Sequence, residues 1–134
     1  MFAPRETGAE ETGLAHQKLV RRKRASGVKQ AGALDRKALE GMSSDFQILA
    51  SPVRLQILEI LARADGEVCV SDLEDAVPVQ QPTVSHHLRE LRKAGLVDST
   101  KRGLWACYFV NREAVAALRS RILAALERFE HPNA

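Results

Sequence analysis

The stretch that decides the fold is PVQQPTVSHHLRELRKAGLV, residues 78–97. Pro82 fits the first turn of a helix, where its missing N–H leaves no hydrogen bond unmade. Gly95 suits the left-handed position that ends a helix. Between them, three apolar residues recur at helical spacing: Val84, Leu88 and Leu91. The stretch therefore predicts a short amphipathic helix whose apolar stripe packs on a core.

The opposite side of this helix carries groups suited to DNA. Reading DNA requires a helix that fits the major groove, donors on its outer face and cations for the phosphates. The helix residues predicted to contact DNA are Gln81, Thr83, Ser85, His86, Arg89 and Lys93. His87 falls toward the apolar edge and is predicted to be a packed histidine. Since neighbouring helical residues diverge by about 100°, His86 and His87 are not expected to chelate a metal.

Helical patterns also precede this stretch. Apolar residues recur at helical spacing from Asp35 to Leu49, and Pro52 then starts a second helix, PVRLQILEILARA, which ends at Asp65-Gly66. EVCV, residues 67–70, is predicted to be a short strand. Ser71 is expected to cap the next helix, with Glu74 three residues on as in a capping box.

The sequence after Gly95 predicts a β-hairpin and a final helix. LVDSTKRGLWACYFV, residues 96–110, alternates apolar residues around a Lys-Arg-Gly turn, and Lys101 and Arg102 at its tip are added to the predicted DNA contacts. Asn111 is expected to cap a last helix with a long apolar stripe. So much apolar surface on a small domain favours burial in a second copy. The predicted dimerisation residues are Phe46, Leu49, Val115, Leu118, Ile122, Leu126 and Phe129.

Length and charge divide the 134 residues into two parts. Residues 1–34 hold seven Lys or Arg against three Glu, have few apolar residues and are predicted to be a disordered basic tail. Within it, the RRKR run of residues 21–24 is interpreted as a solvated charge run rather than a DNA contact. Residues 35–131 form the expected single domain, in which residues 82–112 hold six Lys or Arg against two acids. The chain lacks a long apolar run and an apolar secretion signal, so we expect a cytoplasmic, nucleoid-associated protein.

The predicted order is helix, helix, strand, helix, reading helix, hairpin, helix. This is a mainly α fold with a small β-hairpin wing, a winged helix-turn-helix with an additional C-terminal dimerisation helix. Four motifs, ILASPVRLQILEIL, EVCVSDL, QPTVSHHLRELRKAGLV and GLWACYFV, together resemble the ArsR/SmtB family of bacterial metal-responsive repressors. The resemblance is strong over residues 45–112 and extends to about 35 and 130. It implies a homodimer on an inverted-repeat operator, with the wing against the DNA backbone or minor groove, and release by an inducer.

The residues for sensing depart from the family pattern. Many members carry a CVC pair that binds arsenite or soft divalent metals with a third cysteine, but this chain reads Cys69-Val70-Ser71. Other members bind zinc through aspartate-histidine and histidine-glutamate pairs on the last helix, and this chain has neither pair. The resemblance therefore implies the repressor without either usual metal site.

A second cysteine leaves three alternatives open. In a winged helix the strand carrying Cys69 pairs with the returning hairpin strand, which carries Cys107, and alternation is expected to place both thiols on one outward face. They could bind As(III), Cd(II), Zn(II) or Cu(I) with a third ligand from the partner or from His16, form a redox-sensing disulfide, or merely pack as small apolar groups. No cofactor is expected to be needed for folding.

The prediction from sequence is a sequence-specific, dimeric DNA-binding repressor of the ArsR type that is not an enzyme. Two copies of residues 81–94 would enter major grooves about one helical turn apart. A thiol oxidoreductase is disfavoured because the chain has no C-x-x-C motif. A dimeric winged-helix interaction module without metal sensing is the other alternative.

Overall fold

The computed structural model describes residues 35–133. In this part of the chain, five helices and three strands follow one another, and their bounds are α2 (Arg36–Leu49), α3 (Pro52–Arg63), β1 (Val68–Cys69), α4 (Val70–Ala76), α5 (Gln81–Lys93), β2 (Val97–Arg102), β3 (Trp105–Val110) and α6 (Arg112–Glu130). The order confirms the predicted winged helix-turn-helix with an added terminal helix. The basic tail predicted for residues 1–34, including the RRKR run and His16, lies outside the described residues.

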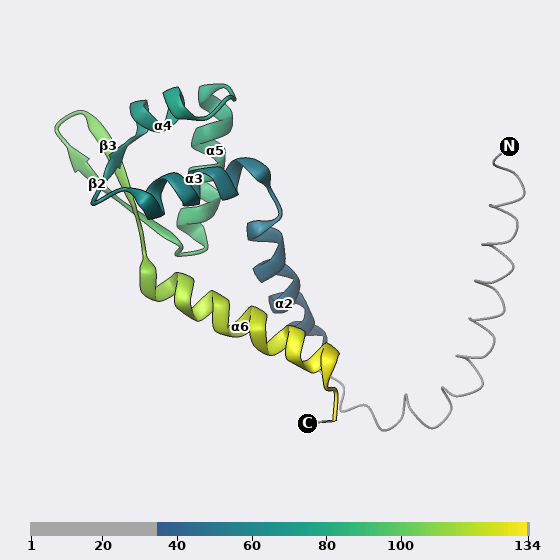
Figure 1. The fold of residues 1–134 in the computed structure, drawn as a ribbon. Coiled ribbons are helices and arrows are strands. Elements are labelled where there is room, and N and C mark those ends of the chain that lie inside the picture. The colour runs from purple at the N-terminus through teal and green to yellow at the C-terminus, as the bar shows by residue number, and fades with distance from the viewer. Residues whose placement is uncertain (1–34, 134) are drawn as a thin grey trace, which may run out of the picture. The chain divides into compact units, whose positions relative to one another are not determined.

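The elements form two groups in space. Helices α3, α4 and α5 cluster together, and the β2–β3 hairpin projects from one side of them (Figure 1). Helices α2 and α6 lie side by side at the other end of the domain (Figure 1). The reading helix and the hairpin thus belong to one end, and the terminal helix to the other. Within residues 35–133, none of the helices combines the length and the hydropathy of a membrane span.

Three of the five described helices, α2, α3 and α6, begin with a side-chain cap. The side chain of Asp35 accepts from the backbone N–H of Ala38 at 2.7 Å, and Ser51 caps α3 ahead of Pro52. Asn111 accepts from the N–H of Ala114 at 3.1 Å, as predicted for the last helix. Each bond satisfies one of the N–H groups that a helix start leaves without a partner.

The start of α4 differs from its prediction. Cys69, rather than Ser71, is the N-cap residue, and the helix makes no side-chain cap hydrogen bond. The predicted capping box of Ser71 and Glu74 is therefore wrong. Pairing of β1 with β3 extends through Cys69, so the chain turns directly from strand to helix and leaves Ser71 inside the first turn.

Helix α5 ends as its glycine predicts. Gly95 has a φ of 79°, the N–H of Leu96 donates to the carbonyl of Leu91 at 3.0 Å, and the N–H of Gly95 donates to Arg92 at 3.0 Å. These two bonds define a Schellman motif. They turn the chain from α5 into β2 and place Leu96 in the core, where it is 2% exposed.

The core joins the three clustered helices to the hairpin. Its members, all nearly inaccessible to solvent, are Ile57, Leu61, Leu73, Val77, Val84, Leu88, Leu91, Leu96, Val97 and Leu118. The predicted stripe of α5 is among them, which fixes the opposite side of that helix toward solvent. Burial of this apolar side chain area is the main force that orients the reading helix.

The sheet is antiparallel with the strand order β1-β3-β2, so β3 is central. Val68 pairs with Tyr108, and Cys107 pairs with Cys69 on one side and Thr100 on the other. The prediction that the Cys69 strand pairs with the returning hairpin strand is confirmed. Tyr108 and Val110 pack against the core, so the alternate residues of β3, including Cys107, face away from it.

Candidate nucleic-acid interface

The outer face of α5 presents four of its six predicted DNA contacts openly to solvent. Gln81, His86, Arg89 and Lys93 are exposed, while Thr83 and Ser85 are partly buried at the flanks. The Lys93 Nζ lies 3.6 Å from a carboxylate oxygen of Glu90. Opposite this face, Val84, Leu88 and Leu91 are at most 1% exposed. The helix therefore combines a fixed inner face with a free polar outer face of the width a major groove admits.

His87 is packed, in agreement with its predicted position at the apolar edge. Its side chain is partly buried, and its Nδ1 atom is buried without a hydrogen-bond partner among the described residues. Burial lowers the pKa of His87, and the positive charge of Arg54 and the neighbouring His86 lower it further, whereas Glu90 acts in the opposite direction. His87 is thus held neutral and does not belong to the exposed DNA-facing set.

The hairpin tip combines the two predicted cations, Lys101 and Arg102, with an exposed apolar end that was not predicted. Lys101 pairs with Ala106 and Arg102 with Trp105, so the two cations point to opposite faces of the hairpin. Leu104 in the turn is fully exposed and Trp105 is 57% exposed. Both were visible in the sequence, since a turn places its residues away from the core.

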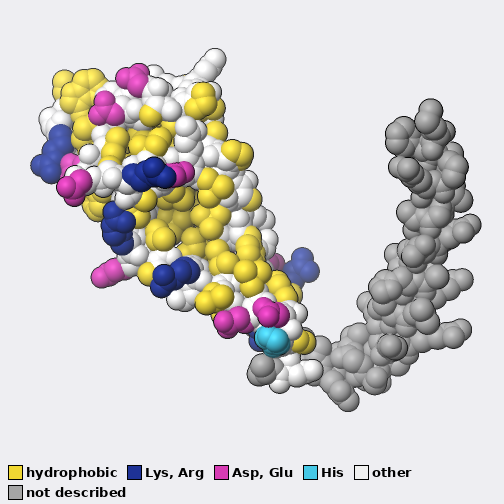
Figure 2. All heavy atoms as spheres, in the orientation of Figure 1, with side chains coloured by type: hydrophobic (Ala, Val, Ile, Leu, Met, Phe, Trp, Pro, Cys, Tyr) yellow, Lys and Arg dark blue, Asp and Glu magenta, His cyan; other side chains and the backbone are white. Residues whose placement is uncertain are grey.

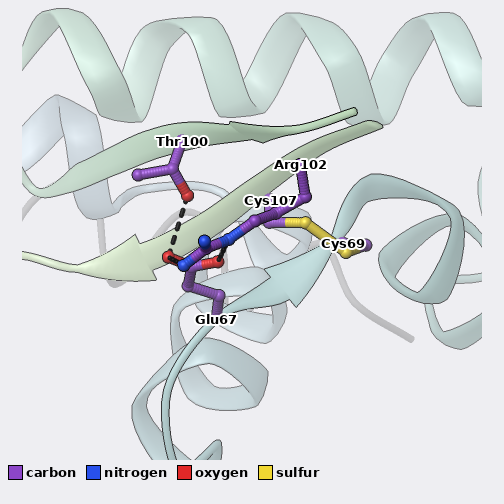
Figure 3. The surroundings of a disulfide bond; sticks show 5 residues. All are labelled: Glu67, Cys69, Thr100, Arg102 and Cys107. Atoms are coloured by element: carbon purple, nitrogen blue, oxygen red, sulfur yellow. Dashed lines mark hydrogen bonds and ion pairs between the residues drawn. A yellow bond between two sulfur atoms is a disulfide. The ribbon is translucent and has the colours of Figure 1, made fainter. Parts of the chain in front are cut away.

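Glu67 connects the start of β1 to the tip of the wing. Its carboxylate accepts hydrogen bonds from Thr100 Oγ1 at 2.8 Å and from Arg102 Nε and Nη2, both at 3.0 Å. The hydrogen bonds from Arg102 and then Thr100 lower the pKa of Glu67, and the same pair raises the pKa of Arg102. Because β3 lies between β1 and β2, the Glu67 side chain crosses over β3 to make these bonds (Figure 3). Only the strand register, absent from the sequence, could have revealed this link.

A disulfide joins Cys69 to Cys107 beneath this link (Figure 3). The prediction that the two sulfurs share one face, directed away from the core, is confirmed, but this face is not exposed at Cys107. Cys107 is 1% exposed, and Cys69 is partly exposed. The disulfide holds Cys69 against Cys107 on the side of the central strand that faces away from the core.

A second surface lies along α6. Figure 2 shows hydrophobic side chains gathered over this helix and its neighbours. An open groove of about 490 Å³ there is lined almost entirely by apolar side chains, including Val115, Ile122, Leu123 and Leu126. Among the predicted dimerisation residues, Phe46, Val115, Leu126 and Phe129 are exposed, whereas Leu49 and Ile122 are partly buried against the core.

One predicted dimerisation residue lies in the core, and two exposed apolar residues of α2 and α6 were not predicted to belong to the dimer surface. Leu118 is 4% exposed and is part of the core cluster, because its turn of α6 faces the rest of the protomer. Leu39 and Leu123 are about half exposed instead. Helical periodicity locates the apolar stripe, but the division of that stripe between core and surface depends on tertiary packing.

The geometry just described is that of known regulators. A family model described as "Bacterial regulatory protein, arsR family" matches residues 51–99. The HTH-type transcriptional regulator NmtR of Mycobacterium tuberculosis is 36% identical over 107 residues, which cover 75% of this chain and 88% of that protein. The chain belongs to the ArsR family. The arsenic resistance transcriptional regulator ArsR1 of Pseudomonas putida is 33% identical, with 66% of this chain and 71% of that protein covered.

Solved structures extend the likeness of this ArsR-family protein to the fold. The solution structure of a homodimeric winged helix-turn-helix DNA-binding domain from Mycobacterium bovis, a possible ArsR-family regulator, has a TM-score of 0.53 and 35% identity. The match covers 76% of this chain and 93% of that one. A crystal structure of another ArsR family transcriptional regulator has a TM-score of 0.57 and 25% identity, with 74% and 97% covered. The family membership makes the protein a winged helix-turn-helix regulator.

Proposed function

We propose that the protein is a homodimeric repressor that binds operator DNA through α5 and the wing, and that it has no catalytic role. The observation that carries the proposal is the difference between the two faces of α5. The apolar side chains of its inner face are at most 1% exposed, and Gln81, His86 and Arg89 are exposed on its outer face. Lys93, Lys101 and Arg102 supply cations beside it. Because its ligand is operator DNA, the protein would be located in the cytoplasm, bound to the bacterial nucleoid.

The α6 surface supports the dimer. Val115, Leu123 and Leu126 are exposed apolar residues on one groove, and leaving such a groove in water is unfavourable. A second copy is its simplest occupant, because an isologous interface uses the same patch twice. The homodimeric state of the M. bovis domain supports the same assignment. Two α5 helices related by a two-fold axis then match an inverted repeat with half-sites about one helical turn apart.

An inducer that binds at Cys69 and Cys107 would release the repressor from its operator. Relatives carry names for resistance to arsenic and cadmium. In the described part of this protomer, however, there is no group of three or more His, Cys, Asp or Glu that could hold a metal ion. Cys69 and Cys107 supply two sulfurs, and As(III), Cd(II) or Zn(II) needs at least one more ligand. The donors present do not complete such a site, so metal binding at Cys69 and Cys107 stays a prediction that requires a ligand from outside these residues.

A competition assay tests the repressor function. The full-length chain is mixed with a fluorescent fragment from upstream of its own gene, and unlabelled competitor of the same sequence is compared with a shuffled fragment of equal length and composition. A repressor is displaced at a much lower concentration by its own sequence than by the shuffled one, since base contacts and not phosphate contacts distinguish them. Equal displacement by both fragments would favour the interaction module without operator specificity.

A further inference from the structure

We propose that Cys69 and Cys107 form a reversible thiol–disulfide site for low-molecular-weight thiols and disulfides, and that its oxidised form holds Arg102 of the wing away from DNA. The inference rests on the proposed repressor function and adds a regulatory input to it. It starts from the direct pairing of the two cysteines across β1 and β3. Because the ladder itself holds these two residues opposite each other, their sulfurs remain neighbours when the bond between them is broken.

The two cysteines differ in exposure, since Cys69 is partly exposed and Cys107 is buried, and this difference defines the order of the chemistry. A small thiolate attacks the Sγ of Cys69, the bond between the cysteines breaks, and Cys107 leaves as a thiolate that takes up a proton. A second small thiolate then attacks the added sulfur, which releases the thiol of Cys69 and one molecule of the small disulfide. Two thiols are oxidised and one protein disulfide is reduced, and the reverse reaction oxidises the pair again. Cys107, at 1% exposure, is the buried partner in both directions.

The disulfide links the two parts of the DNA interface. Cys69 is the N-cap residue of α4, and Leu73 of this helix and its C-cap residue Val77 pack into the core that also holds α5. Cys107 lies in β3, the returning strand of the wing. The bond therefore ties the start of the helix-turn-helix to the wing, across a ladder in which β1 contributes only two residues.

Glu67 connects the disulfide to the positive charge of Arg102. It lies two residues before Cys69 and accepts two hydrogen bonds from Arg102. While the disulfide fixes β1 to β3, the carboxylate stays over the wing and occupies a guanidinium that could otherwise bind a phosphate. Reduction leaves the two-residue β1 pairing and the three hydrogen bonds of Glu67 as the restraints on this carboxylate. Without the covalent link, β1 can move away from the wing, and a DNA phosphate can then replace Glu67 as the partner of Arg102. Reduced protein is therefore the tighter DNA-binding form, with one more phosphate contact per protomer.

Binding of both redox forms to the fragment upstream of the gene tests the switch. We expect the reduced wild-type protein to bind at least about fivefold more tightly than the oxidised protein. Its affinity should also fall more steeply with salt, by about one unit of log–log slope per added phosphate contact and hence about two for the dimer. The Cys69→Ser, Cys107→Ser double variant should bind like the reduced wild type under both conditions. Equal affinities and slopes for oxidised and reduced wild type would overturn the inference.

The isosteric Glu67→Gln variant tests the route through Arg102. Its amide keeps the size of the side chain but removes the charge that holds the guanidinium, so its oxidised and reduced forms should both bind like the reduced wild type. An unchanged redox difference in Glu67→Gln would overturn the role of this ion pair. If no protein form and no variant binds the fragment, the repressor function itself fails, whereas tight binding that ignores redox state removes the switch alone.

Single-cysteine variants test the predicted order of attack. Incubated with oxidised glutathione and analysed by mass spectrometry, Cys107→Ser should form a mixed disulfide at Cys69 rapidly, and Cys69→Ser should react at Cys107 at least about tenfold more slowly, as its burial requires. Equal rates would contradict the assignment of Cys69 as the entry point.

Discussion

Arg121 of α6 donates two hydrogen bonds to the carboxylate of Asp45 of α2, at 2.9 and 3.1 Å. The Asp45 side chain is 20% exposed, so the pair joins the two helices at a partly shielded position. These hydrogen bonds raise the pKa of Arg121. The pair fixes α2 beside the helix that carries the proposed dimer surface.

Removal of this pair is expected to weaken the domain slightly. Because Arg121 is more than half exposed and screened by solvent, Asp45→Ala should lower the free energy of unfolding by about 1 kcal/mol or less. Urea denaturation at low and high salt measures it, and the loss should shrink as salt screens the pair. Arg36→Ala, which removes an exposed pair with Glu40, is the matched control and should change stability less. An equal loss for both variants would contradict the role given to Asp45 and Arg121.

Replacing two glycines by alanine should change the stability of the domain in opposite directions. Gly95 needs a φ of 79°, so Gly95→Ala should destabilise the domain by about 1 kcal/mol or more. Gly41 lies inside α2 with open space where a Cβ would be added, so Gly41→Ala should stabilise it by about 1 kcal/mol or less. Thermal denaturation of both variants checks the pair of signs. A stabilising Gly95→Ala would mean that the Schellman motif does not end α5.

A charge in the α6 groove should separate the protomers. Leu126 is 49% exposed and lines the groove, so Leu126→Glu places an unpaired carboxylate where the second copy packs. Light scattering should give the mass of a dimer for the wild type and of a monomer for this variant. Ala124→Glu, on an exposed part of α6 outside the groove lining, should remain a dimer. A dimeric Leu126→Glu protein would place the interface elsewhere.

His87 predicts a loss of stability in weak acid. Burial and the nearby Arg54 lower its pKa in the folded state, so below about 6.5 the unfolded chain takes up the proton more readily than the folded one. The stabilising contribution of neutral His87 is therefore complete above that pH and decreases as the pH falls toward the folded pKa. The free energy of unfolding, measured between about pH 5 and pH 8 where histidine titrates, should decrease as the pH falls. His87→Leu should flatten this pH dependence, whereas His86→Gln, which removes only a smaller cause of the lowered pKa of His87, should flatten it less. An equal effect of both variants, or a profile that both leave unchanged, would contradict the assignment.

The sequence predicted those parts of the molecule that local chemistry decides. Pro82, Gly95 and the stripe of Val84, Leu88 and Leu91 located α5 and its outer face, because capping and periodicity act within one helix. The pairing of the Cys69 strand with the Cys107 strand was also predicted, from the topology of the winged helix.

The remaining features depend on contacts between distant segments. The bridge from Glu67 to Thr100 and Arg102 spans more than thirty residues and follows from strand register, so no local pattern could predict it. The sequence left three alternatives open for Cys69 and Cys107, because the burial of Cys107 also depends on packing between distant segments. Leu118 was assigned to the dimer surface because periodicity alone does not separate the core side of α6 from its exposed side.

The most direct test of the central claim, that the outer face of α5 binds operator DNA, is the affinity of Arg89→Ala for the upstream fragment. Measured by fluorescence anisotropy on reduced dimers, Arg89→Ala should bind the fragment more weakly than the wild type does, by about 1 to 3 kcal/mol or roughly five- to 150-fold. Arg36→Ala, which removes an exposed arginine from α2 at the other end of the domain, should bind like the wild type. Wild-type affinity in Arg89→Ala, or an equal loss in Arg36→Ala, would contradict the account.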